Sequence, residues 1–154
     1  MFYVSHPLDN IRSYYACNPR RNVRRGMTDD IMGDGRRPIV ALSRWRVAWE
    51  DVICDDKAGT CSGTVLRYDA RRRGTAFIAD WDRQRPATDL VMTRTGAVAW
   101  IRRVGAAGTQ VAAVDSNGER ALETGTAIEP GSLAVAGRRI YWMSGGEART
   151  ARLD

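Results

Sequence analysis

The chain contains 154 residues, 44% of them hydrophobic, and carries a formal net charge of +6. This length normally forms one domain with one core, and no apolar run approaches the roughly 20 residues that a membrane-spanning helix needs. The first residues, MFYVSHPLDN, lack the basic segment followed by an apolar one that marks a secretory signal. We therefore expect a single domain, residues 1–154, without a membrane span.

The positive charge comes almost entirely from arginine, because Lys57 is the one lysine among 24 basic residues. A basic chain raises the possibility of a nucleic acid or another polyanion as a partner. Most of the arginines, however, stand in segments such as PRRN, RRR and GRR, which have the composition of exposed turns. A solvated surface explains the charge better, and binding to nucleic acid is the less favoured interpretation.

Three ten-residue segments of the chain resemble one another. They are VALSRWRVAW, VMTRTGAVAW and LAVAGRRIYW, and each ends in an aliphatic residue, a small or aromatic residue and a tryptophan. These tryptophans are Trp49, Trp100 and Trp142. Self-similarity at a spacing of about 40 to 50 residues is typical of repeat folds.

A second shared phrase follows each tryptophan after a polar connection. It reads VLRYDARRRGTAFI, VAAVDSNGERALET and TARLD, and it places Asp69, Asp115 and Asp154 at equivalent positions. Upstream, YYACNPRRNVRRGM fits the same phrase with Asn18 in the aspartate position. We interpret the tryptophans and aspartates as structural anchors of four copies of one unit. The approximate bounds of the copies are 1–37, 38–86, 87–129 and 130–154.

Each unit has the composition of strands joined by tight turns. Val47, Val98 and Ile140 lie beside tryptophans and short aliphatic residues, a β-branched and aromatic bias that is typical of strands. The pair Asn117–Gly118 tolerates the positive φ angles of a two-residue hairpin, which predicts antiparallel pairing of 111–115 with 120–124. Apolar stripes of period 3.6 are absent, so almost no helix is expected. The clearest copy predicts strands at about 39–42, 46–53, 64–69 and 75–79.

Units of this length with four antiparallel strands and an aromatic anchor are characteristic of β-propeller blades. The four units predict three, four, four and three strands, because the first copy lacks its opening strand and the last lacks its closing one. We therefore predict an all-β, propeller-like array of four-stranded antiparallel blades that forms an incomplete ring. The chain would be a fragment of a longer propeller, one half of a homodimer that completes the ring, or an open stack, and the first is favoured over the second.

The stretch IYWMSGGEARTARLD resembles the YWTD-type and TolB-like six-bladed β-propeller repeat, in which a Tyr-Trp strand precedes a short loop and a strand like R-x-x-L-D. The matching residues are Tyr141, Trp142, Arg152, Leu153 and Asp154. Met143 and Ser144 stand where the YWTD pattern has Thr and Asp, and in such families that aspartate often takes part in hydrogen bonds between blades. The departure argues against the YWTD subgroup. The resemblance implies recognition of a protein or ligand outside the cytoplasm.

The three cysteines are Cys17, Cys54 and Cys61. Cys54 and Cys61 flank DDKAG, a polar segment with a glycine that suits a reversal of chain direction. If the flanking strands pair, the two sulfur atoms can come within bonding distance, and Cys17 is left as the odd thiol. A disulfide would indicate an oxidising compartment and, with the resemblance, favours an extracytoplasmic location, although the opening residues contain no signal segment. Three reduced, buried cysteines are the alternative.

The candidate binding residues are Trp81, Arg83 and Arg85, in the polar segment ADWDRQRPATD. An exposed Trp81 could stack on a sugar or a partner side chain, and the two arginines could hold an anionic group. The alternative is that Trp81 packs between blades.

No residue is predicted to be catalytic. Glu50 and Asp51 are adjacent on a predicted strand, so they point to opposite faces and do not share a site. The CSG segment at Cys61 lacks the flanking glycine of a nucleophile elbow. His6 is the single histidine and no CxxC occurs, so neither a zinc site nor any other cofactor is expected. The sequence favours a non-catalytic binding or scaffold module for a protein or small ligand, with a propeller-type hydrolase or lactonase-like enzyme and a polyanion-binding surface as alternatives.

Overall fold

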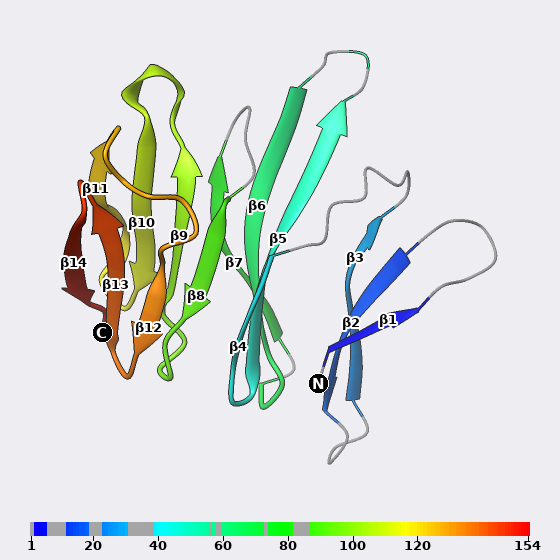
Figure 1. Cartoon of the computed structure of the whole chain (residues 1–154). Helices are drawn as coiled ribbons and strands as arrows, with labels where there is room; N and C mark the ends of the chain where they lie inside the picture. Colours follow the sequence, from blue (N-terminus) through cyan, green and yellow to red (C-terminus); the bar gives the residue numbers. More distant parts are fainter. Residues whose placement is uncertain are drawn as a thin grey trace.

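The computed structural model describes residues 2–5, 12–18, 23–30, 39–55, 57, 60–72, 74–81 and 87–154, with side-chain surroundings for 39–50, 57, 63–72, 74, 76, 78, 79 and 87–154. Within these ranges the chain forms fourteen β-strands in four antiparallel sheets (Figure 1). One 3-10 turn, η2 (Gly105–Ala107), is the only helical segment of the described ranges. None of the described helical structure is long and apolar enough to cross a membrane.

Each sheet contains strands that follow one another along the chain. The first sheet consists of β1 (Phe2–Ser5), β2 (Arg12–Asn18) and β3 (Val23–Asp30). The second sheet consists of β4 (Val40–Ser43), β5 (Arg46–Asp55), β6 (Thr60–Asp69) and β7 (Gly74–Trp81). The third sheet consists of β8 (Asp89–Met92), β9 (Val98–Arg103), β10 (Thr109–Asp115) and β11 (Gly118–Gly125). The fourth sheet consists of β12 (Ala134–Ala136), β13 (Arg139–Ser144) and β14 (Glu147–Arg152).

The described strands confirm the all-β prediction and the expected division into three, four, four and three strands. The strands of the second sheet also start and end within a few residues of the predicted bounds. One turn was predicted one residue too late. β10 and β11 close at the pair Asp115 and Gly118, so the two-residue connection is Ser116–Asn117. Only Gly118 takes the positive φ there, at 94°, because glycine lacks the Cβ that penalises this conformation.

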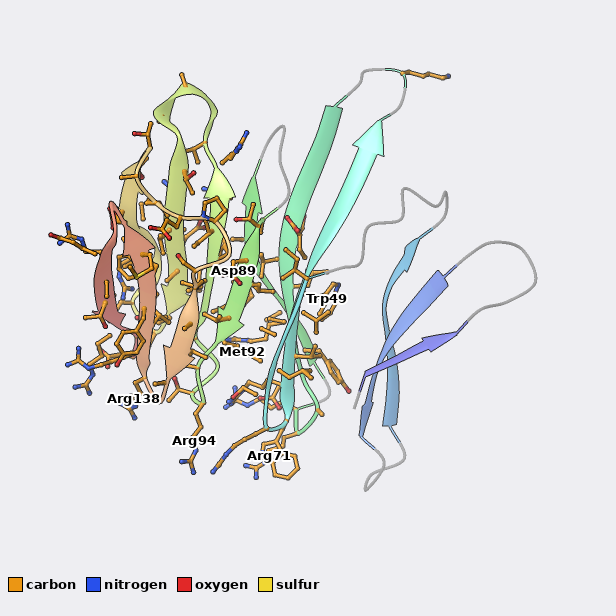
Figure 2. All side chains as sticks on the ribbon, in the orientation of Figure 1. Trp49, Arg71, Asp89, Met92, Arg94 and Arg138 are labelled. Atoms are coloured by element: carbon orange, nitrogen blue, oxygen red, sulfur yellow. The ribbon has the colours of Figure 1, made fainter. Side chains whose placement is uncertain are left out.

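The third sheet is buried on both faces. Val98 and Trp100 of β9 pack with residues of the second sheet, whereas Ala99 and Ile101 pack with residues of the fourth sheet. Successive side chains of a strand point to opposite faces, so a strand between two sheets needs apolar residues at every position. This explains the continuous apolar run AVAWI, which shows no alternation. Figure 2 shows Met92 at the boundary between the second and third sheets.

The repeated tryptophans are buried, with Trp49, Trp100 and Trp142 at 2%, 0% and 5% exposure. Trp100 packs toward the second sheet and Trp142 toward the third. Trp49 belongs to a separate cluster with Val47 and Tyr68, on the face of the second sheet that is turned away from the third (Figure 2). In the second and third sheets the tryptophan therefore lies on the face opposite to the one that the following sheet covers, and Trp142 lies on the face of the fourth sheet that is turned toward the third.

The first strands of three successive sheets lie near one another. β8 of the third sheet contacts β4 of the second and β12 of the fourth. Figure 1 shows the four sheets in a row, with the first sheet beyond the second. The described sheets do not close into a ring.

Candidate functional site

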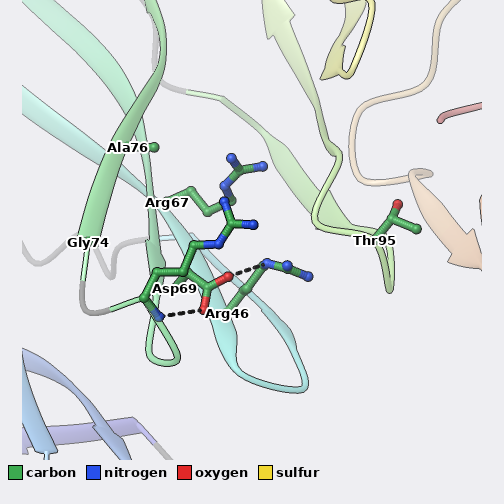
Figure 3. A pocket seen from close by; sticks show the side chains of 7 residues that line it. Arg46, Arg67, Asp69, Gly74, Ala76 and Thr95 are labelled. Carbon is green, nitrogen blue, oxygen red and sulfur yellow. Dashed lines mark hydrogen bonds and ion pairs between the residues drawn. The ribbon is translucent and has the colours of Figure 1, made fainter.

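A cavity of about 390 Å³, with charged side chains in its wall, lies where the second sheet meets the third (Figure 3). Most of its wall comes from β5, β6, β7 and the β6–β7 turn of the second sheet, and one residue comes from the β8–β9 turn of the third. Figure 2 places Arg71 and Arg94, which belong to these two turns, at the same end of the molecule. The lining residues are Arg46, Arg67, Asp69, Arg72, Gly74, Ala76 and Thr95.

Strand pairing brings Arg46 and Asp69 together. They are direct partners in the β5–β6 register, and Arg46 Nε donates a hydrogen bond of 2.9 Å to Asp69 Oδ2. The other oxygen, Asp69 Oδ1, accepts from the backbone amides of Arg71 at 2.9 Å and Arg72 at 3.4 Å. The aspartate thus closes the β6–β7 turn in the manner of an Asx turn and holds one arginine at the cavity wall.

Two arginines of the second sheet reach across to the β8–β9 turn. Arg67 Nη1 donates to the carbonyl oxygen of Gly96, and Arg46 Nη1 donates to the carbonyl oxygen of Arg94 at 3.4 Å. Gly96 has a φ of 97°, and a Cβ on it would lie 2.8 Å from Arg46 Cδ. Glycine at this position therefore permits both the turn conformation and the close approach of the arginine.

The cavity carries excess positive charge. Among the lining residues that the structure describes, three carry guanidinium groups and Asp69 carries the one carboxylate. Burial lowers the pKa of Arg67 below its ordinary value, and the positive charges of Arg46 and Arg72 add to this effect. Arginine nevertheless stays charged at neutral pH. Burial would raise the pKa of Asp69, but hydrogen bonds from the turn amides and the charge of Arg46 outweigh it, so the pKa lies below its ordinary value. The described lining residues are thus ionised, and their three guanidinium groups and one carboxylate sum to a charge near +2.

Further carboxylates connect the sheets. Glu50 Oε1 accepts from the Ala87 amide at 2.6 Å, and Asp89 Oδ2 accepts from the Leu133 amide at 2.7 Å. Glu123 of the third sheet accepts from the Trp142 indole and the Ser144 hydroxyl of the fourth. Ser144 stands where the YWTD pattern has aspartate. A hydrogen bond between neighbouring sheets is therefore present at this position, donated by a hydroxyl group.

Asp115, the repeated aspartate of the third sheet, also closes a turn. Arg120 binds Asp115 through two hydrogen bonds of 2.8 Å, and the Asn117 and Asp154 amides donate to the same carboxylate at 2.9 and 3.0 Å. The bonds from Arg120 are the main reason why the pKa of Asp115 lies well below its ordinary value. The Asp154 carboxylate lies 3.3 Å from Arg152 Nε.

The candidate binding residues from the sequence are Trp81, Arg83 and Arg85. Trp81 is the last residue of β7, but its side chain is outside the described part, as are Arg83 and Arg85. The described residues contain no group of three or more His, Cys, Asp or Glu side chains suited to a metal ion. Reasoning from the sequence did not find the arginine cavity. Arg67 and Asp69 are two residues apart on β6, so their side chains share a face of the strand. This spacing is the feature of the sequence that could have pointed to a charged site.

Cys54 and Cys61 are direct partners in the β5–β6 register. The same register continues without a break to Trp45 and Ala70, where the Ala70 amide donates to the Trp45 carbonyl at 2.8 Å. Hydrogen-bonded and non-hydrogen-bonded pairs alternate along antiparallel strands, so the odd-numbered residues of β5 are in hydrogen-bonded pairs and the even-numbered ones are not. Cys54 and Cys61 therefore form a non-hydrogen-bonded pair, for which the Cα atoms are about 4.5 Å apart. That separation lies within the range that a disulfide spans. The cysteine side chains are outside the described part.

Comparison with protein-family models and with curated proteins finds no match for this chain. The likeness to TolB-like and YWTD-type repeats therefore rests on the residues quoted from the sequence.

Proposed function

We propose that the protein is a non-catalytic binding module built from propeller-like blades. The observation that carries this proposal is the arginine-lined cavity between the second and third sheets. Its volume of about 390 Å³ falls in the range of small-molecule sites, and its wall is fixed by the Arg46–Asp69 pair and by the bonds to the β8–β9 turn. A preformed cavity on a packed scaffold suits recognition of a ligand.

Two features support the propeller-like part of the proposal. The strands of each sheet follow chain order, and the first strands β4, β8 and β12 lie near one another. Blades of a propeller have this arrangement, with the first strand of each blade nearest the central axis. Membership of a TolB-like family is proposed on the motif at residues 141–154 alone.

The proposal is tested by mapping ligands on the folded protein. A set of small anionic, neutral and cationic compounds is added to ¹⁵N-labelled protein, and amide shifts are recorded. We expect at least one class to shift the amides of Gly96 and Thr95 in a saturable manner, whereas the amide of the exposed Gly131 stays unchanged. Failure of all classes to shift the cavity amides would contradict the proposal, as would turnover of the bound compound.

A homodimer that completes the ring remains a second part of the proposal. It is supported by Tyr141, which is 37% exposed on the outer face of the fourth sheet, whereas Ala48 and Ala99 at the equivalent positions are fully buried under the next sheet. A mass in solution near twice 17.1 kDa is the expected result for a dimer. A mass of 17.1 kDa at all concentrations would exclude it.

The register of β5 and β6 supports a Cys54–Cys61 disulfide and, with it, a location in an oxidising compartment. A thiol count on the unfolded, unreduced protein is expected to give one free thiol, Cys17. Three free thiols after oxidative refolding would rule out the bridge.

A further inference from the structure

The cavity charge is balanced only in part by the described residues. Asp69 is already engaged by Arg46 and by two turn amides. Among the residues that the structure describes, no ion pair involves Arg67 or Arg72. Two guanidinium charges therefore face the cavity without a carboxylate partner from this part of the chain.

The guanidinium groups keep donors available. Arg67 uses Nη1 for the Gly96 carbonyl, and Arg46 uses Nε and Nη1. Within the described residues, no hydrogen bond uses Nη2 of either side chain. Figure 3 shows the Arg46 side chain directed toward the β8–β9 turn that carries Thr95. Guanidinium forks at such a site match the paired oxygen atoms of a carboxylate or a phosphate.

The charge of the cavity favours a phosphate group over a carboxylate as its ligand. A net charge near +2 is neutralised by one dianion, and a phosphate monoester carries about −1.5 to −2 at neutral pH, whereas a carboxylate carries −1. Gly74, which has no side chain, and Ala76, which has a small one, form another part of the described wall. We propose that the cavity binds the phosphate group of a small phosphomonoester through Arg46, Arg67 and Arg72. This inference rests on the proposed binding function and names its ligand class.

Binding of phosphate would also join the two sheets more tightly. Arg46 and Arg67 already contact the β8–β9 turn, so a ligand that fixes their side chains favours the packed arrangement. A ligand that binds the folded state alone raises its stability in proportion to the logarithm of the ligand concentration. Phosphomonoesters should therefore raise the melting temperature of the protein.

The test uses the full chain and four probes: inorganic phosphate, glycerol 3-phosphate, acetate and glycerol. Affinity is measured by calorimetry, and the site is located by the amide shifts of Gly96 and Thr95. The two phosphates are expected to bind and to shift these amides, with glycerol 3-phosphate tighter. Acetate is expected to bind at least tenfold more weakly, and glycerol not measurably.

Variants separate the cavity from the overall charge. Arg67→Gln and Arg72→Gln should each weaken phosphate binding about tenfold, because each removes a charge-assisted hydrogen bond. Arg94→Gln is the matched control, since it removes a charge from the adjacent turn while keeping the carbonyl that Arg46 contacts. It should change affinity by less than about twofold. Arg72 is exposed, so its variant keeps the test valid if Arg67→Gln fails to fold.

Four results would overturn the inference. Absence of phosphate binding would do so, and equal weakening by Arg94→Gln and Arg72→Gln would show that the general positive field is responsible. Binding of a DNA duplex that resists competition by phosphate would assign the charge to a polyanion surface. If a neutral compound shifts Gly96 and Thr95 while phosphate does not, the binding module stands and the phosphate class is wrong.

Discussion

The strands β9 and β13 occupy the same place in the repeat but differ in their surroundings. Ala99 and Trp100 of β9 are both fully buried, whereas Tyr141 and Trp142 of β13 are 37% and 5% exposed. The tryptophan face is covered in both strands, and the other face is covered only in β9. The burial of a strand therefore depends on whether neighbouring sheets cover both of its faces, and the repeated sequence does not determine it.

The largest expected effect comes from the residue at the centre of the stack. Trp100→Ala should lower the free energy of unfolding by about 3–5 kcal/mol, because it removes a fully buried indole and leaves a cavity. Chemical denaturation at neutral pH measures the change. The comparison with β13 fails if Tyr141→Ala, on the exposed face, costs as much.

A smaller effect is expected at the contact between the third and fourth sheets. Glu123→Ala removes the acceptor for the Trp142 indole and the Ser144 hydroxyl, so unfolding should become easier by about 1–3 kcal/mol. Glu147→Ala is the control, because that side chain is 70% exposed and its ion pair is with the exposed Arg149. A loss of less than about 0.5 kcal/mol for Glu123→Ala would mean that this contact does not stabilise the stack.

The same boundary should make stability depend on acid pH. The folded pKa of Asp115 lies below its unfolded value, mainly because Arg120 donates to the ionised form, and the pKa of Glu123 is lowered mainly by the Ser144 hydroxyl. Their contribution is complete above the unfolded pKa values, near 4, and is lost as pH falls through the folded values.

Asp89 acts in the opposite direction. Burial raises its pKa, so its contribution to the free energy of unfolding is present at acid pH and is lost as pH rises through the folded pKa.

The experiment is urea denaturation at a series of pH values. Urea midpoints from pH 7 to pH 3 should fall on acidification, and Asp115→Asn should flatten this dependence. An unchanged slope in the variant would show that another group is responsible. Glu129→Gln, at an exposed position, is the control.

The smallest effect is expected on the outer face of the fourth sheet. Tyr141→Thr replaces an exposed residue with another residue that favours strands, so the monomer should change by less than about 0.5 kcal/mol. If the outer face binds a second copy, the variant should instead lower the mass in solution. Light scattering across a concentration series distinguishes the two outcomes.

The strands were predictable because each repeat carries its own turn residues and anchors. Asp69 was identified from the repeated phrase, and its pairing with Arg46 follows from the β5–β6 register. The cavity was not predictable in this way. Arg67 and Gly96 are 29 residues apart, and Arg46 and Arg94 are 48 apart, so their contacts depend on how two sheets stack. No local pattern encodes the distance between separate sheets.

The double coverage of the third sheet has a consequence for how the molecule opens. Amides of β9 and β10 can exchange with solvent only after a neighbouring sheet has moved away or the whole stack has unfolded. Hydrogen exchange should therefore be slowest at Ile101 and Val111, which are fully buried, and faster toward β14. Arrays in which each unit contacts only its neighbours unravel from their ends. The third sheet would then be the last part of the array to lose its native pairing.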